Sequence, residues 1–203
     1  MFETLYLAAG RQKVLIVENV PSADEFAFEH SAIDSRHTEA AQWRLNPDED
    51  RVMFGVMRTL AKRAVFDFFH KKSGVQEEHF TSLISPRALI ASNVVVSRGC
   101  YVEPAVVLSP YVRLGFGVTL NRSVSVGHHV EIGSYATINP GAHVGGHAKI
   151  GHDATIGIGA IVFDHIEIGE RSVIGGGSVV TKRIPVGVIA YGNPCRVVRE
   201  LSE

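Results

Sequence analysis

The stretch Val126-Gly-His-His-Val-Glu-Ile132-Gly-Ser-Tyr-Ala-Thr-Ile138 decides the fold, because Val126, Ile132 and Ile138 stand six residues apart. From here the same spacing runs in both directions over seventeen positions. All seventeen are Ile, Leu or Val: Ile84, Ile90, Val96, Val102, Leu108, Leu114, Leu120, Val126, Ile132, Ile138, Val144, Ile150, Ile156, Val162, Ile168, Ile174 and Val180. An α-helix repeats every 3.6 residues and a strand every 2, so neither explains a period of six. We therefore interpret the period as a structural repeat.

The other positions of the six-residue unit follow the same period. Four residues after each anchor stands a small or β-branched residue, as at Ala136, Ala142, Ala148 and Ala154. From residue 115 onward, the residue directly after the anchor is usually Gly, which suits a tight turn. Each unit thus combines a large inward residue, a small inward residue and a turn.

Composition excludes several classes of protein. The 203 residues include 20 Lys and Arg against 21 Asp and Glu, a net charge of −1, which gives no support for a nucleic-acid or membrane-surface partner. Two cysteines, Cys100 and Cys195, make no disulfide framework. No basic region with an apolar run follows Met1, and no apolar run approaches the roughly 20 residues that span a bilayer. We expect a cytoplasmic protein with no membrane partner.

The chain on either side of the repeat has a different pattern. Residues 1–80 predict a small α/β unit with parallel strands. Its expected parts are a helix over 2–11, strands over 13–17 and 51–56, a polar loop over 46–50, and a helix over 59–72 that ends at Gly74. The segment from 187 carries Gly192 and Pro194, so we expect it to leave the repeat as an irregular tail.

The repeat resembles the hexapeptide repeat of left-handed β-helix proteins, in which three hexads form one triangular coil. The order of parts resembles the bacterial sugar O- and N-acetyltransferases of the sialic acid and bacillosamine pathways, which serve cell-surface polysaccharide biosynthesis. Three stretches carry that resemblance: Ser82-Leu-Ile-Ser-Pro-Arg-Ala88, Leu120-Asn-Arg-Ser-Val-Ser-Val-Gly-His128 and Gly192-Asn-Pro-Cys-Arg196. It implies a mainly β chain, with a small, truncated Rossmann-like α/β domain at 1–80, a left-handed parallel β-helix at 81–186 and a tail at 187–203.

The resemblance also implies an activity. It predicts a homotrimer that moves an acetyl group from acetyl-CoA to an amino or hydroxyl group of a sugar or sugar nucleotide, without a metal. The catalytic residues it implies are His128, as general base, with Asn121 and His129. Those implied for acetyl-CoA are Thr137, Gly146, Ile158, Gly176 and Lys182, and those for the acceptor are Glu18, Asn19 and Gly55. His suits the role of base, because its pKa lies near neutral pH.

Two departures from the family pattern shape these expectations. The first domain lacks the Gly-rich loop that holds nucleotide phosphate, so we predict that residues 1–80 bind the acceptor weakly or bind something other than a nucleotide-sugar. The residue after the base is His129, where relatives carry Asp or Glu. A neutral His129 can orient His128 by a hydrogen bond, but it supplies no negative charge.

A column of histidines leaves a second reading open. His129, His147 and His165 recur at intervals of three hexads, which is one full coil, so we expect them to stack on one edge of three coils. They could line the acyl-CoA groove, hold a metal or form a solvated corner. Three imidazoles in a line about 4.8 Å apart cannot all reach one ion at about 2.0–2.1 Å, so we predict no catalytic metal there. The alternative functions are a zinc enzyme resembling γ-class carbonic anhydrases and a degenerate, non-catalytic relative.

For the homotrimer, we expect prism faces rich in small and apolar residues, such as Val95, Val107 and Ala160, to be buried between subunits.

Overall fold

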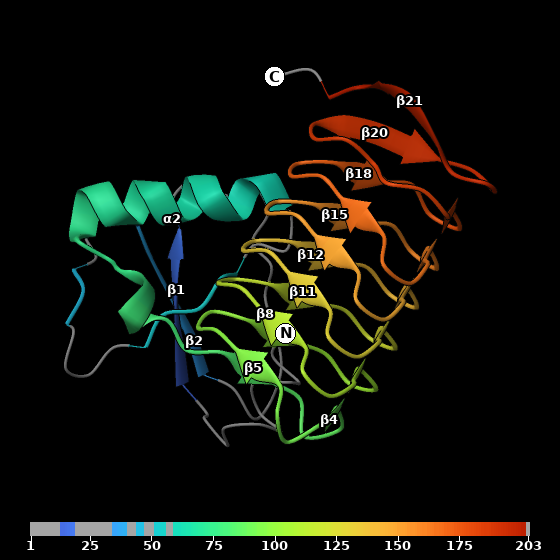
Figure 1. The fold of residues 1–203 in the computed structure, drawn as a ribbon. Helices are drawn as coiled ribbons and strands as arrows, with labels where there is room; N and C mark the ends of the chain where they lie inside the picture. The colour runs from blue at the N-terminus through green and yellow to red at the C-terminus, as the bar shows by residue number, and fades with distance from the viewer. Residues whose placement is uncertain (1–12, 19–33, 40–43, 47–50, 56–58, 202–203) are drawn as a thin grey trace.

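The computed structural model describes residues 13–18, 34–39, 44–46, 51–55 and 59–201. The chain is mainly β, and its largest part is a left-handed β-helix of about six turns. Seventeen strands of two residues each, β3 to β19, follow one another every six residues and stack into three parallel sheets (Figure 1). The second residue of each strand is one of the seventeen anchors, so the predicted period of six is confirmed.

The strands belong to three sheets, which form the faces of a prism. The six-stranded sheet contains β4 Leu89–Ile90, β7 Val107–Leu108, β10 Ser125–Val126, β13 His143–Val144, β16 Ile161–Val162 and β19 Val179–Val180. The five-stranded sheet contains β5 Val95–Val96, β8 Arg113–Leu114, β11 Glu131–Ile132, β14 Lys149–Ile150 and β17 Glu167–Ile168. The eight-stranded sheet contains β3 Leu83–Ile84, β6 Tyr101–Val102, β9 Thr119–Leu120, β12 Thr137–Ile138, β15 Thr155–Ile156, β18 Val173–Ile174, β20 Val188–Tyr191 and β21 Arg196–Glu200.

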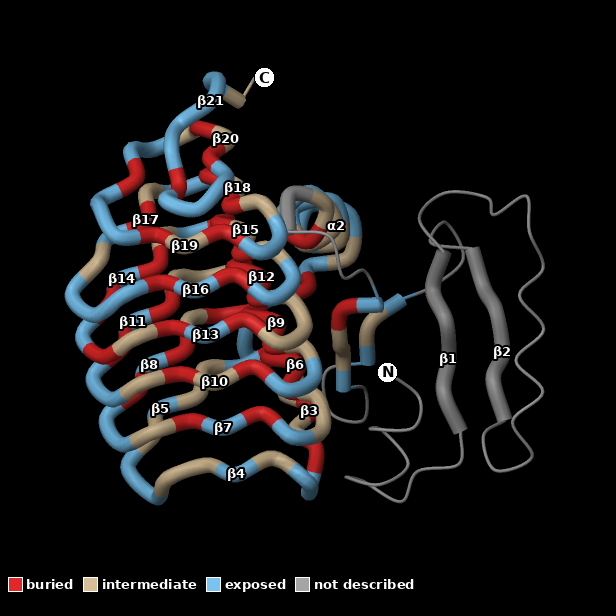
Figure 2. Tube along the Cα trace, turned by 90° about the vertical axis from the view of Figure 1, so that its right-hand side faces the viewer, coloured by how far each residue is buried: buried red, intermediate tan, exposed pale blue. Residues whose placement is uncertain are grey.

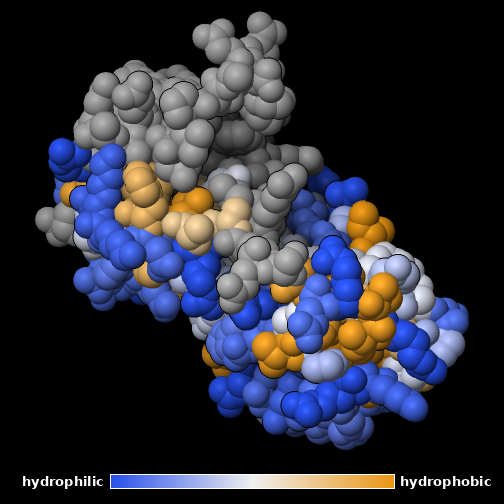
Figure 3. Space-filling view, turned by 90° about the horizontal axis from the view of Figure 1, so that it is seen from above, coloured by the Kyte–Doolittle hydropathy of each residue, from blue (hydrophilic) through white to orange (hydrophobic). Residues whose placement is uncertain are grey.

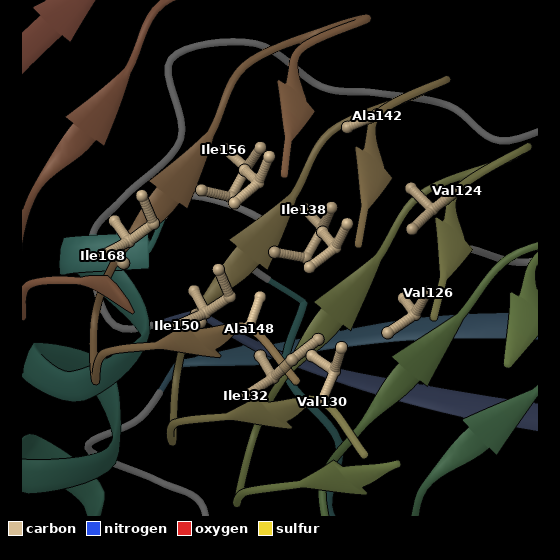
Figure 4. Packing of buried hydrophobic residues seen from close by; sticks show 14 of the residues in the cluster. Val124, Val126, Val130, Ile132, Ile138, Ala142, Ala148, Ile150, Ile156 and Ile168 are labelled. Atoms are coloured by element: carbon tan, nitrogen blue, oxygen red, sulfur yellow. The ribbon is translucent and has the colours of Figure 1, made fainter. Parts of the chain in front are cut away.

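The pairing register confirms the coil of three hexads. Ile132 pairs with Ile150, and Ile150 pairs with Ile168, so identical positions of successive coils lie directly above one another. Figure 4 shows these isoleucines in a row inside the prism. Because the spacing between anchors never changes, every coil presents the same side-chain positions at the same corner.

The core of the prism is made of the anchors and the small residues between them. Every anchor from Val102 to Val180 is buried, and Ala136, Ala142, Ala148 and Ala154 have no exposed area. Large and small residues alternate around each coil, which fills the narrow interior at the density of a protein core. Ala160 is also fully buried, so its expected place on an outer face was wrong. It stands four residues after Ile156, which is the small inward position.

The prism's three outer faces differ in chemistry. The five-stranded face carries exposed side chains of alternating charge along most of its length: Arg113, Glu131, Lys149 and Glu167. The six-stranded face presents mostly apolar side chains: Leu89, Val107, Ile161 and Val179, with Ser125 and His143 between them. Leu89, Val107 and Ile161 are 68%, 37% and 39% exposed. The eight-stranded face is covered by the preceding segment over its middle strands, where the outward side chains of Tyr101, Thr119 and Thr137 are buried.

Helix α2, Thr59–Ser73, is the covering element, as Figure 2 shows. Its predicted position is confirmed, and Gly74 follows it in the left-handed region at φ 68°. Phe66 of the helix packs with Phe54, Phe80, Phe116 and Tyr135 in an aromatic cluster against the prism. The apolar side of α2 and the apolar side chains of the prism thereby bury each other.

Polar contacts fix the same helix to the sheet. Lys62 has no exposed area, and its Nζ donates to the Gly117 carbonyl at 2.7 Å, to Thr119 Oγ1 at 3.1 Å and to the Ala136 carbonyl at 3.3 Å. The next residue of the helix, Arg63, donates to the buried Asp153 carboxylate.

The rest of the segment 1–80 agrees only in part with the predictions. Strand β1, Lys13–Glu18, is confirmed, and it pairs in parallel with β2, Asp34–Glu39, which was not predicted. The strand expected at 51–56 was wrong over its described residues, because only Val52 forms a single bridge, to Phe80. A short 3-10 helix, η1, spans Glu77–His79. The predicted helix at 2–11, the loop residues 47–50 and Asn19 lie outside the described residues.

The prediction of an irregular tail from residue 187 was also wrong. Strand β20 continues the eight-stranded sheet in parallel with β18, and β21 returns antiparallel to β20. The Gly192-Asn-Pro-Cys195 stretch provides the turn, which explains why its composition reads as a loop. This end of the prism faces the viewer in Figure 3, and it exposes Val186, Tyr191, Val197 and Val198. Among the described helices, none has the length and apolar character needed to cross a membrane.

Candidate active site

The corner between the six-stranded and five-stranded sheets carries His128 and His129. The two residues form the tip of the turn that joins β10 to β11, and both are exposed. His129 has a positive φ of 56°, and Tyr111, His147 and His165 repeat that conformation at the same place in neighbouring coils. The left-handed conformation is costly for most side chains, and His tolerates it better than β-branched residues do. The turn therefore directs His128 and His129 outward from the prism.

The two imidazoles are in direct contact. Nδ1 of His128 lies 3.1 Å from Nδ1 of His129, a hydrogen-bond distance. One nitrogen must donate and the other accept, because a neutral imidazole has one N–H group. If His128 donates, its Nε2 atom carries the free lone pair. The contact therefore allows His129 to orient the ring of His128.

Gly146, one coil above, lies against the ring of His128. A methyl group added at Gly146 would be 3.1 Å from Nε2 and 3.2 Å from Cε1 of His128. The Gly146 N–H donates to Oδ1 of Asp164, one coil further on, at 2.7 Å. The missing side chain leaves room for the imidazole, and the Asp164 carboxylate holds the backbone that borders it.

A surface groove of about 480 Å³ begins at this corner. It runs along the outer face of the six-stranded sheet, and its lining combines the corner residues with strand positions that face outward. The lining residues are Ser125, Gly127, His128, His143, Val144, Gly145, Gly146, Ile161, Val162, Phe163 and Asp164. The exposed Ile161 and Phe163 offer apolar contact, while His128, His143 and Asp164 offer polar contact. A long, flexible ligand could lie here with its reactive end at His128.

Three other predicted site residues lie at a different corner, between the eight-stranded and six-stranded sheets. Asn121 donates from its side-chain amide to the Ile138 carbonyl at 3.2 Å. Ile158 is 65% exposed, and a methyl group added at Gly176 would be 3.2 Å from the Ile158 carbonyl oxygen. Within one chain, the structure does not bring these residues to His128.

The remaining predicted residues are spread over the chain. Lys182 is exposed and follows β19 at the same coil position as His128, Gly146 and Asp164. Thr137 is only 4% exposed, because its outward position in β12 belongs to the sheet that α2 covers. Glu18 ends β1, and Gly55 is exposed. Asn19 lies outside the described residues.

The column of histidines is confirmed. The rings of His129 and His147 stack at 4.9 Å between centroids, and those of His147 and His165 at 4.7 Å. His128 stands edge-on to His147, with centroids 4.9 Å apart. Partial desolvation, together with the neighbouring imidazoles of His165, His129 and His128, lowers the pKa of His147. The surroundings of His147 therefore favour its neutral form.

The sequence analysis missed Asp164 and His143 as site residues. Asp164 follows His128 by two full coils, so the period places it at the same corner. His143 follows Ser125 by one coil, on the outward position of the next strand of the same sheet. The period alone could have identified both positions. Their contacts with the groove depend on side-chain directions, which only the folded chain defines.

Comparison with known proteins supports the assignment of the fold. No protein-family model and no curated protein matches this chain. Among solved structures, the acetyltransferase domain of PglB from Neisseria gonorrhoeae, in complex with acetyl coenzyme A, is 26% identical. The match covers 76% of this chain and 73% of that one, with a TM-score of 0.69.

Two further structures are similar over comparable lengths. WeeI from Acinetobacter baumannii AYE is 28% identical over 74% of this chain and 72% of its own, with a TM-score of 0.63. PerB from Caulobacter crescentus, in complex with CoA and GDP-perosamine, is 22% identical over 73% and 70%, with a TM-score of 0.68. The chain is therefore a hexapeptide-repeat protein with the left-handed β-helix fold of the bacterial sugar acetyltransferases.

Proposed function

We propose that the chain transfers the acetyl group of acetyl-CoA to an amino or hydroxyl group of a sugar or sugar nucleotide. The observation that carries the proposal is the exposed His128, held by His129 and bordered by the side-chain-free Gly146 at the end of a groove. The similar structures support it, because PglB was solved with acetyl coenzyme A and PerB with CoA and GDP-perosamine. The acetyl donor follows from the same similarities.

The reaction uses His128 as general base. The acceptor nitrogen or oxygen attacks the thioester carbon, while Nε2 of His128 takes the proton that the acceptor loses. His129 accepts a hydrogen bond from Nδ1 of His128, so the ring keeps its lone pair at Nε2 and shares the positive charge it gains. The tetrahedral intermediate then expels the CoA thiolate, which takes the proton back from His128.

We propose a homotrimer because one prism face remains apolar and uncovered. The eight-stranded face is closed by α2, and the five-stranded face carries the charged ladder from Arg113 to Glu167. The six-stranded face, with Leu89, Val107 and Ile161 exposed, is the surface that gains most from burial.

A trimer would also complete the site. The corner with Asn121, Ile158 and Gly176 and the corner with His128, Gly146 and Lys182 border the same six-stranded face on opposite sides. In a closed ring, one corner of a subunit can approach the other corner of its neighbour. Acetyl-CoA would then lie between subunits, with its thioester at His128. Thr137 is the predicted contact that fits this placement least, because α2 covers it.

We propose that residues 1–80 form the acceptor domain, with Glu18, Asn19 and Gly55 toward the acceptor. The parallel pairing of β1 with β2 supports this proposal, because a Rossmann-like unit is built on a parallel sheet. Since the chain has no Gly-rich loop, we expect weak binding of UDP- and GDP-sugars. Calorimetry with both classes tests this, and tight binding of either would contradict it.

Release of CoA measures the proposed reaction directly. The chain is incubated with acetyl-CoA and a panel of amino sugars, either free or linked to UDP or GDP, and the new thiol is detected with an aromatic disulfide. Both cysteines are buried, so the protein contributes little background. We expect acceptor-dependent release with at least one sugar. Binding of acetyl-CoA without release for any acceptor would instead support the degenerate relative, and CO₂ hydration that requires zinc would support the carbonic-anhydrase reading.

A further inference from the structure

Three histidines at the candidate site bring their ring nitrogens together. One nitrogen from each of His128, His129 and His147 lies within 4.8 Å of the other two, and all three side chains are exposed. The Nδ1 atoms of His128 and His129 are only 3.1 Å apart. Two imidazole ligands of one tetrahedral ion with metal–nitrogen bonds of about 2.0–2.1 Å are separated by about 3.3 Å. That pair is thus already close to ligand spacing.

This cluster is not the straight column of His129, His147 and His165. Two of its members come from one turn and the third from the next coil, so the cluster is not a stack of one residue per coil. The ring of His128 is perpendicular to both others, at 89° to each, while His129 and His147 are nearly parallel at 14°. The distance limit that keeps His129, His147 and His165 from sharing one ion therefore does not hold for this cluster.

We propose that His128, His129 and His147 bind a divalent transition-metal ion, with Zn²⁺, Ni²⁺ and Cu²⁺ as the class that imidazole ligands favour. The Nδ1 atoms of His128 and His129 supply two ligands, and the proton that one of them donates to the other moves to Nε2 of the same ring when the ion binds. His147 lies at the exposed tip of its turn, so a rotation about its side-chain bonds brings its nitrogen into range. Water occupies the fourth position, which remains open to solvent.

The ion would act as an inhibitor, an inference that rests on the proposed function. A neutral imidazole has one proton, and a metal on Nδ1 of His128 leaves that proton on Nε2. Nε2 then has no lone pair and cannot take the acceptor's proton. The proposed acetyl transfer needs no metal. The ion therefore inhibits the reaction by blocking His128 and does not act as a cofactor.

Binding is tested first, without reference to activity. The full chain, freed of any affinity tag and treated with a chelator, is titrated with ZnCl₂ in a calorimeter. We expect one ion per chain. His147→Asn should weaken binding by about 10–100-fold or more, while the matched control His165→Asn, one coil on in the same column, should change it little. Absence of binding heat above dilution, or an equal loss in both variants, would overturn the site.

Inhibition is tested second, with the sugar acceptor that supports CoA release. Zn²⁺ should abolish release at saturating acetyl-CoA, a chelator should restore it, and His147→Asn should transfer normally and resist Zn²⁺. If Zn²⁺ binds through these histidines but release continues unchanged, the inhibitory role is overturned. If the chain binds Zn²⁺ as expected yet releases no CoA under any condition, the proposed function fails and the metal site stands.

Discussion

The proposed role of His128 rests on the residues that contact its ring more than on its place at a turn. An exposed histidine at a turn is ordinary, but this one has a hydrogen-bond partner at Nδ1 and a glycine at Nε2. If His128 donates the hydrogen bond, its lone pair lies on Nε2, the atom beside Gly146. The proposed base would then lose little freedom when the acceptor binds.

Replacing His128 by Ala should reduce acetyl transfer by about 10²–10⁴-fold, the usual contribution of a positioned base. The dissociation constant of acetyl-CoA, measured by calorimetry, should remain nearly unchanged, because the imidazole acts on the acceptor. His165→Ala is the matched control, an exposed histidine two coils away at the same corner, and it should keep full turnover. Near-full turnover of His128→Ala would show that the base lies elsewhere.

Gly146→Ala should also slow transfer, because its methyl group would lie 3.1 Å from Nε2 and push the ring aside. A double-mutant cycle separates this cause from a general loss of structure. In the His128→Ala background, the Gly146→Ala change should cost little more, since no imidazole remains to be displaced. Equal losses in both backgrounds, measured as turnover, would show that Gly146 acts independently of His128.

At the scale of elements, helix α2 is held to the prism by a buried lysine. Burial lowers the pKa of Lys62 to about 7, although Cys100 and Asp153 favour its charged form. Three oxygens accept hydrogen bonds from its Nζ. The protonation state of one side chain is thus linked to the docking of a whole helix.

The stability of the chain should rise with pH between 7 and 9. The ordinary pKa of Lys62 is 10.5, so above pH 7 the unfolded chain binds more protons than the folded chain. The free energy of unfolding should then increase by up to about 1.4 kcal/mol per pH unit. Above pH 9 the increase should level off. Burial raises the pKa of the Cys100 thiol to about 11 from 9.0, so the folded chain there keeps a proton that the unfolded chain loses.

Urea denaturation at pH 7, 8 and 9, at one chain concentration, measures this slope. Lys62→Met should flatten it, whereas Lys149→Met, on the exposed five-stranded face, should leave it as in the parent chain. An unchanged slope in Lys62→Met would mean that Lys62 keeps an ordinary pKa in the folded chain.

At the scale of the whole molecule, the difference between the prism faces determines how copies could assemble. Val107 and Val95 are both exposed valines that begin a strand, at 37% and 50%. Val107 belongs to the apolar six-stranded face, while Val95 stands at the end of the charged ladder. Although both valines were expected to be buried between subunits, the structure favours only the face of Val107.

Val107→Glu should therefore convert the proposed trimer to monomers, because an unpaired carboxylate would be buried between subunits. Val95→Glu should remain trimeric. Light scattering at micromolar concentration measures both masses. A parent chain that is already monomeric would rule out the trimer, and a trimeric Val107→Glu would place the interface on another face.

Sequence alone could predict the prism because its signal is repeated seventeen times. Each of the seventeen anchors must be apolar because its side chain points into the prism. A local irregularity therefore does not hide the period. The stacking of His129, His147 and His165 followed from the same count. The segment 51–56 had no such repetition. Two of its apolar residues, Val52 and Phe54, belong to an aromatic cluster instead of a strand.

By itself the sequence determined the fold of residues 83–180, the corner that carries His128 and the family that this pattern resembles, since all three depend on spacing along the chain. Only the tertiary structure decided that Gly146 borders the base, that Lys62 is buried under α2, and that the histidines of one corner meet in a cluster. These contacts join residues that are well separated along the chain, and they do so through the direction of their side chains. Side-chain direction depends on how the coils and the covering helix pack, and spacing alone does not contain it.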